Sequence, residues 1–119
     1  MRSGRVRFFN GVREVAACHV QLTETVLERT RGLLGRPKPG SDEALLITPC
    51  NAVHTFGMRY ALDLVYIARN GAVRKIVHAL PPRRLSGCLR AHAVLELVAG
   101  TVAHWNLDRG MKMEWCNDD

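Results

Sequence analysis

Apolar and β-branched residues recur along this chain in short runs, and these runs predict a protein built mainly from β-strands. Two of them, residues 6–9 and 12–22, enclose Asn10-Gly11, which is a strong signal for a two-residue hairpin turn. Residues 62–68 and 73–78 enclose a second Asn-Gly pair and form the clearest hairpin of the sequence. We therefore expect two antiparallel hairpins, one at the start and one in the middle of the chain.

Further apolar runs indicate additional strands. They are residues 44–48, residues 93–99 and a closing pair, 102–107 and 111–115, around Asp108-Arg109-Gly110. Residues 79–91 contain two adjacent prolines and two adjacent arginines, a composition typical of a loop. Loops of this length in compact domains are often binding elements, so we expect residues 79–91 to lie over the sheet and to contribute to a binding site.

One segment has the spacing of a helix. Thr25 and Glu28 form a capping-box pattern, and apolar residues follow at helical intervals as far as Leu34. Gly35 and Pro37 then supply the signals that commonly end a helix. The sequence therefore predicts one short α-helix, from about residue 25 to residue 34.

Many short strands with regular turn signals and a single helix are typical of a small antiparallel β-sandwich or barrel. In such a fold, we expect the helix to cover one open edge or end of the sheet. The 119 residues are enough for one hydrophobic core without disulfide or metal support, so residues 1–119 are predicted to form a single domain.

The chain carries a formal net charge of +6, which raises the question of a nucleic-acid partner. Its arginines and lysines are scattered along the sequence, and aromatic residues make up only 6% of it, which leaves little for base stacking. We therefore interpret the basic residues as solvated surface charge and do not expect nucleic acid to be the partner.

The sequence also bears on the compartment. No apolar run approaches the roughly 18–20 residues that a membrane span needs. The basic N-terminal segment is not followed by the apolar region of a signal peptide. We therefore expect a cytoplasmic protein whose four cysteines are mostly reduced and form no disulfide framework.

Three motifs occur in an order that is known from one protein family. They are Arg31-Gly32-Leu33-Leu34, then Met58 with Leu62-Asp63, then Leu95-Glu96-Leu97 followed by Gly100. In their order and spacing the chain resembles, from about Val12 to Glu114, the bacterial and archaeal family catalogued as domain of unknown function 192. The resemblance implies a small, mostly antiparallel β-sandwich or barrel of jelly-roll character, and it implies no established activity.

The chain departs from the usual family pattern around Met58. That pattern reads more like Trp-Met-Lys-Asn-Thr, whereas this sequence has Phe56-Gly57-Met58-Arg59-Tyr60. A role that depends on the family's tryptophan or asparagine therefore cannot be transferred to this chain.

Two Cys-x-x-x-His patterns, Cys50 with His54 and Cys88 with His92, are the sharpest candidates for chemistry. Two thiolates and two imidazoles are a sound tetrahedral zinc set if the two segments converge, and the chain would then be a zinc-stabilised domain or a metal-dependent hydrolase. Cys50 and His54 alone could form a nucleophilic dyad. The alternative is two small buried cysteines and two unrelated loop histidines, and on that interpretation no cofactor is expected.

Asp63 and Glu96 are carboxylates within apolar strands, where an unpaired buried charge is too costly. Arg31 on the predicted helix could bind one of them and fix the helix to the sheet, so we expect a structural ion pair among these three residues. The alternative is a carboxylate-based enzyme in which Asp63 or Glu96 acts as acid or base, with His54 as the partner.

A ligand groove is expected where residues 54–63 approach the 79–91 loop. Its predicted lining combines apolar and cationic side chains: His54, Phe56, Met58, Arg59, Arg83 and Arg84. Such a lining suits a small anionic ligand or an acidic peptide. The alternative is a core Phe and Met with solvated arginines. The sequence thus favours a binding or accessory module over an enzyme, and it leaves the oligomeric state open.

Overall fold

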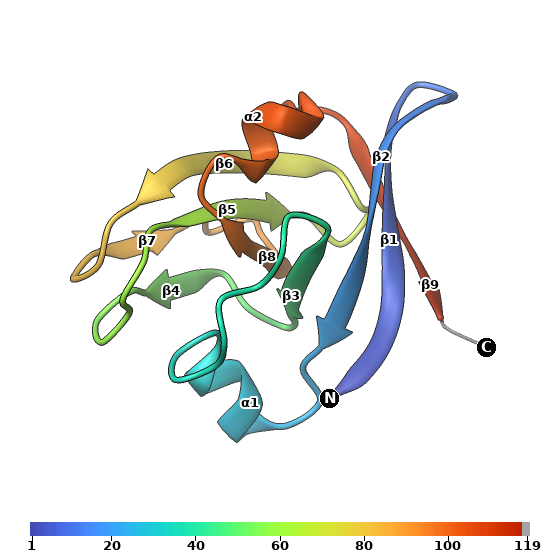
Figure 1. Ribbon diagram of the computed structural model, residues 1–119. Helices are drawn as coiled ribbons and strands as arrows, with labels where there is room; N and C mark the ends of the chain where they lie inside the picture. The colour runs from blue at the N-terminus through green and yellow to red at the C-terminus, as the bar shows by residue number, and fades with distance from the viewer. Residues whose placement is uncertain (118–119) are drawn as a thin grey trace.

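Nine strands and two helices make up the part of the chain that the computed structural model describes, residues 1–117 (Figure 1). The strands are β1 (Arg2–Asn10), β2 (Arg13–Leu22), β3 (Glu43–Ile47), β4 (Ala52–His54), β5 (Leu62–Ile67), β6 (Val73–Leu80), β7 (Leu85–Gly87), β8 (Ala93–Val98) and β9 (Lys112–Asn117). The helices are α1 (Val26–Arg31) and α2 (Thr101–Trp105). Seven strands form one sheet in the order β6–β5–β8–β3–β2–β1–β9, and β4 pairs with β7 in a second sheet. The prediction of a mainly β fold is confirmed.

Both predicted hairpins are present. β1 pairs antiparallel with β2 around Gly11, and β5 pairs antiparallel with β6 around Gly71. The two glycines have φ values of 62° and 88°. Each Asn-Gly turn forms because glycine adopts a positive φ without a steric penalty.

The main sheet is mixed rather than wholly antiparallel. β2 and β3 run parallel, with Val20 beside Ala44, while the other strand pairs of the main sheet are antiparallel. Parallel neighbours need a crossover connection, and here the crossover carries α1. The helix therefore lies at the end of the sheet where β2 finishes (Figure 1).

The two edge strands of the main sheet meet at one corner. Ala72, just before β6, forms an antiparallel bridge with Lys112 of β9. The N–H of Val73 also donates to the carbonyl of Met111 at 2.8 Å. The sheet is therefore curled until backbone hydrogen bonds join its edges at this point.

The predicted capping box begins α1. Thr25 Oγ1 accepts from the Glu28 N–H at 3.1 Å, and the Glu28 carboxylate accepts from the Thr25 N–H at 3.1 Å. The helix ends at Arg31 rather than at Leu34, because Gly32 adopts a φ of 54°.

Among residues 1–117 no helix has the length and apolar character of a membrane span.

Two predictions for the second half of the chain are wrong. Residues 102–107 were expected to form one strand of a closing pair, but residues 101–105 form α2, and β9 pairs with β1 instead. This helix follows Gly100, and the carboxylate of Asp63 accepts hydrogen bonds from the N–H groups of Gly100 and Val102. The expected loop 79–91 contains the end of β6 and all of β7, because β7 pairs with β4.

Alternation along β5 and β8 divides the core between two faces of the sheet. Asp63 lies opposite Leu97 in the β5–β8 register, and Leu64 lies opposite Glu96. Leu97 packs in one hydrophobic cluster with Val65, whereas Leu64 packs in the other. Because successive side chains of a strand point to opposite faces, Asp63 and Glu96 project from opposite faces of the sheet.

Candidate functional site

A groove lies between the C-terminal end of α1 and the segment that carries β4, and we call it the α1 groove. It consists of two cavities of about 150 and 470 Å³ that share Leu33, Leu34 and Met58. The full lining comprises residues 29–37, 52–54 and 57–60, together with Ile47 and Glu96. The α1 groove thus joins the helix motif to the segment around Met58 that the sequence singled out.

Glu96 places a buried carboxyl group in the α1 groove. Its side chain is only 3% exposed, and Oε1 accepts a hydrogen bond from the Leu33 N–H at 3.2 Å. Burial raises the pKa of Glu96 to about 7, and the hydrogen bond from Leu33 opposes this shift only in part. Near neutral pH the group is therefore present both as a carboxylate and as a neutral acid that can donate a hydrogen bond.

Gly32 allows the end of α1 to approach this carboxyl group closely. Its φ of 54° lies in the left-handed region, and a Cβ at this position would be 3.0 Å from Glu96 Oε1. The next residue, Leu33, supplies the N–H that Oε1 accepts. A glycine at the helix end is therefore required both by the backbone conformation and by the space that Glu96 occupies.

We expect Gly32→Ala to destabilise the fold more than Gly11→Ala, which is a matched control. Both changes place a methyl group on a backbone with positive φ, which side chains other than glycine rarely adopt. A Cβ at Gly11 meets nothing within 4 Å, whereas one at Gly32 crowds Glu96, which adds about 1–3 kcal/mol. Urea denaturation followed by circular dichroism measures both, and equal losses would contradict the assigned contact.

Tyr60 adds a second polar group with unmet hydrogen-bonding capacity. Its hydroxyl is buried and has no hydrogen-bond partner among the described residues. Burial raises the pKa of Tyr60, and the negative charge of Glu96 adds to the effect. The Lys38 ammonium lies 5.8 Å from the centre of the tyrosine ring. A buried hydroxyl with unused hydrogen-bonding capacity therefore lies in a residue that borders the groove and contacts a cationic side chain.

Four arginines line the α1 groove: Arg29, Arg31, Arg36 and Arg59. Arg31 Nε donates to the carbonyl of Leu34 at 2.8 Å, and Arg36 Nε donates to the carbonyl of Gly32 at 2.8 Å. Within residues 1–117 the salt bridges involve only the N-terminus and Arg7, so none of the four is paired with a carboxylate. The groove is cationic and remains available to an anion.

The ion pair predicted among Arg31, Asp63 and Glu96 does not form. The Arg31 guanidinium donates to the carbonyls of Leu34 and Gly35, in the turn that follows α1, and Asp63 accepts only backbone N–H groups in the described structure. Asp63 and Glu96 also face opposite sides of the sheet. The alternative enzyme paired Asp63 or Glu96 with His54. Asp63 lines neither cavity of the α1 groove, whereas Glu96 and His54 both line the smaller one, so only the Glu96 pairing stays a prediction.

The predicted zinc set does not assemble, although its two segments lie side by side, with the Cys50 N–H donating to the His92 carbonyl at 2.9 Å. Among the residues described, no group of three His, Cys, Asp or Glu side chains is placed to hold a metal ion. One physical reason is β4 (Ala52–His54), which is extended and carries His54 away from Cys50. Burial also raises the pKa of the Cys50 thiol, which therefore stays protonated and is a poor nucleophile.

The predicted ligand-binding residues are divided between two places. His54, Met58 and Arg59 line the α1 groove. Phe56 is 50% exposed, and its ring centre lies 5.9 Å from that of His54. Arg83 and Arg84 are exposed and line neither cavity of the groove. The segments 54–63 and 79–91 do meet, as predicted. The α1 groove, however, lies between the first of these segments and the end of α1, and no residue of 79–91 lines it.

Thr55 holds these two segments together, a role that no sequence pattern indicated. Its hydroxyl donates to the Pro81 carbonyl at 2.7 Å and accepts from the Arg84 N–H at 2.9 Å. Its own N–H donates to the Arg84 carbonyl at 2.9 Å, and its carbonyl accepts from the Met58 N–H at 3.1 Å. This fully buried threonine therefore fixes the turn that presents Met58 to the groove.

A curled, mainly β sheet with one cationic groove and a buried acid defines a small β-rich domain with a candidate binding site. Residues 9–115 match the family model of domain of unknown function 192, described as uncharacterized ACR, and the chain belongs to this family. A search of curated proteins found no match.

Two solved structures are similar to this chain. One is a candidate transcription regulator from Sinorhizobium meliloti 1021, with a TM-score of 0.85 and 25% identity over 95% of this chain and 93% of the other. The second is a protein of unknown function from Novosphingobium aromaticivorans DSM 12444, with a TM-score of 0.81 and 21% identity over 93% and 84% of the two chains. The second likeness concerns the fold alone.

Proposed function

We propose that this protein is a binding module whose α1 groove takes a small hydroxylated carboxylate, such as a sugar acid. The observation that carries the proposal is Glu96, a buried acid with a single hydrogen bond that lines a groove otherwise rich in arginine. A buried polar group with spare capacity is stabilised by a ligand that bonds to it. The unpartnered hydroxyl of Tyr60 offers a second contact of the same kind.

The charge of the groove supports an anionic rather than a cationic ligand. Arg29 and Arg59 line its two cavities, and guanidinium groups bind carboxylates with two parallel hydrogen bonds. An anion beside Glu96 favours the protonated form, which donates a hydrogen bond instead of repelling the ligand.

Isothermal titration with D-glucuronate is expected to show saturable binding at pH 6 that weakens about tenfold by pH 8. The reason is that the fraction of protonated Glu96 falls by that factor across a pKa of about 7. Neutral D-glucose should not bind measurably at the same concentration. In Glu96→Gln, a permanent mimic of the neutral acid, the affinity should no longer depend on pH.

Arg59→Gln and Arg83→Gln form a matched pair for locating the site. Both residues are exposed, but Arg59 lines the α1 groove and Arg83 lies outside it. Loss of binding in Arg59→Gln alone supports the proposal, and loss in Arg83→Gln alone would move the site to the 79–91 segment. Binding of a tetraglutamate peptide without binding of glucuronate would overturn the small-ligand proposal in favour of an acidic peptide.

A further inference from the structure

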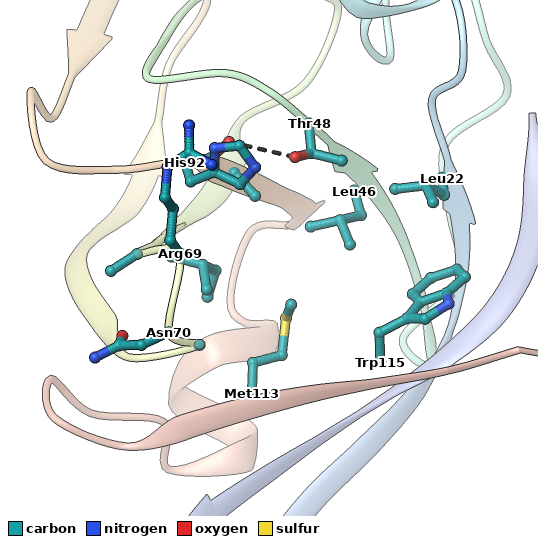
Figure 2. A pocket seen from close by; sticks show the side chains of 12 residues that line it. Leu22, Leu46, Thr48, Arg69, Asn70, His92, Met113 and Trp115 are labelled. Carbon is teal, nitrogen blue, oxygen red and sulfur yellow. Dashed lines mark hydrogen bonds between the residues drawn. The ribbon is translucent and has the colours of Figure 1, made fainter.

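A second cavity lies at the corner of the sheet where the turn between β5 and β6 faces β9 (Figure 2). Its volume is about 330 Å³, and it shares no lining residue with the α1 groove. We call it the β9 cavity. The β9 cavity is therefore distinct from the α1 groove in both place and lining.

One side of the β9 cavity is apolar. Met113 and Trp115 extend into it from β9, and Leu22 and Leu46 contribute from β2 and β3 (Figure 2). Met113 and Trp115 lie two residues apart in one strand, so their side chains share a face. The cavity therefore presents a thioether and an indole ring together, a pair that suits a flat aromatic body.

The indole ring of Trp115 is held in place by its neighbours. A Cβ at Gly4 would overlap two carbons of the ring, so the absence of a side chain there makes room for the indole. The Arg2 guanidinium lies 5.7 Å from the ring centre, and the indole N–H donates to Asn117 at 2.9 Å. Trp115 is therefore positioned before a ligand arrives, which lowers the entropic cost of binding.

The opposite side of the β9 cavity is polar and cationic. Arg69 and His92 line it, and no acidic residue does. Thr48, beside them, donates from its hydroxyl to the backbone carbonyl of His92 at 3.3 Å (Figure 2). Within residues 1–117 neither the Arg69 guanidinium nor the His92 imidazole makes a hydrogen bond or a salt bridge. Both groups are available to an anion.

We propose that the β9 cavity binds a small aromatic carboxylate, with its ring against Met113 and Trp115 and its carboxylate at Arg69. A guanidinium matches a carboxylate geometrically, and an aromatic ring gains from contact with both an indole and a sulfur atom. The cavity lies at the lower end of the roughly 300–1,000 Å³ that is usual for ligand sites, so a single ring fits it. This inference is independent of the function proposed for the α1 groove.

Trp115 also supplies the readout. The chain has two tryptophans, Trp105 in α2 and Trp115 in the cavity, so Trp105→Phe leaves one reporter at the site. Titration of that variant with 3-phenylpropionate is expected to change the Trp115 fluorescence in a saturable manner. The alcohol 3-phenylpropanol, which lacks the carboxylate, should bind at least tenfold more weakly. If Trp105→Phe fails to fold, calorimetric titration of the unaltered protein replaces the fluorescence measurement.

Arg69→Gln and Arg74→Gln provide the matched variants. Both residues are exposed, but Arg74 lies on β6 outside the cavity. We expect Arg69→Gln to weaken binding of 3-phenylpropionate at least tenfold and Arg74→Gln to leave it within twofold. No saturable response, equal affinity for the acid and the alcohol, or equal losses in both variants would overturn the proposal. Octanoate binding as tightly as 3-phenylpropionate would overturn the assignment of an aromatic body.

Discussion

Asp63→Ala is expected to lower the free energy of unfolding by about 3–5 kcal/mol. The carboxylate of Asp63 is fully buried and accepts from three backbone N–H groups, those of Ala79 at 2.8 Å and of Gly100 and Val102 at 3.0 Å each. Alanine leaves these buried donors without acceptors, and each unsatisfied donor costs roughly 1–3 kcal/mol. Urea denaturation followed by circular dichroism measures the change.

Two further variants make this result interpretable. Asp63→Asn keeps one acceptor oxygen but directs an amide N–H₂ group at a backbone donor, so we expect a smaller loss and a protein that still folds. Asp42→Ala, at an exposed position, should change stability by no more than about 0.5 kcal/mol. If Asp63→Ala were as stable as Asp42→Ala, the carboxylate would not be organising the surrounding backbone.

Glu96→Gln is expected to stabilise the protein progressively as the pH rises. The pKa of Glu96 is about 7 in the folded state against an ordinary value of 4.5, so the folded state binds the proton more tightly. This tighter proton binding adds about 3 kcal/mol to the free energy of unfolding below pH 4.5. The added stability is lost as the pH rises through 7. Glutamine, which does not titrate, avoids this loss.

The measurement is the difference in unfolding free energy between Glu96→Gln and the unaltered protein at pH 5 and pH 8. We expect this difference to move by roughly 2–3 kcal/mol in favour of the variant. Glu114→Gln, at an exposed position on β9, serves as the control and should show no comparable trend. A difference that is constant with pH would mean that Glu96 is not buried in the folded protein.

Local signals predicted the elements whose structure is determined locally. The turns at Gly11 and Gly71 and the capping box at Thr25 are each fixed by a few adjacent residues, and each forms as expected. α2 was predicted as part of a strand because Val102 to Leu107 looks apolar, yet its first N–H groups are bound by Asp63, almost forty residues earlier. Such a contact leaves no trace in the helix's own sequence.

Only part of the candidate site was predicted, because contacts between distant segments also complete this site. Glu96 was identified as a buried carboxylate that needs a partner, and it does have one, but the partner is the backbone N–H of Leu33 instead of Arg31. The sequence could not show that Arg31 would bind the carbonyl of Leu34. The pairing of β4 with β7 was equally hidden, because three-residue strands carry too little periodicity to reveal a register.

The parallel pairing of β2 with β3 has a consequence for how this protein can diversify. The connection between these strands supplies α1 and residues 32–37, one whole wall of the α1 groove, without contributing any strand to the sheet. The length and sequence of this connection can therefore change in evolution while the strand register stays unchanged. Descendants of one scaffold can in this way acquire new selectivity without having to rebuild their framework.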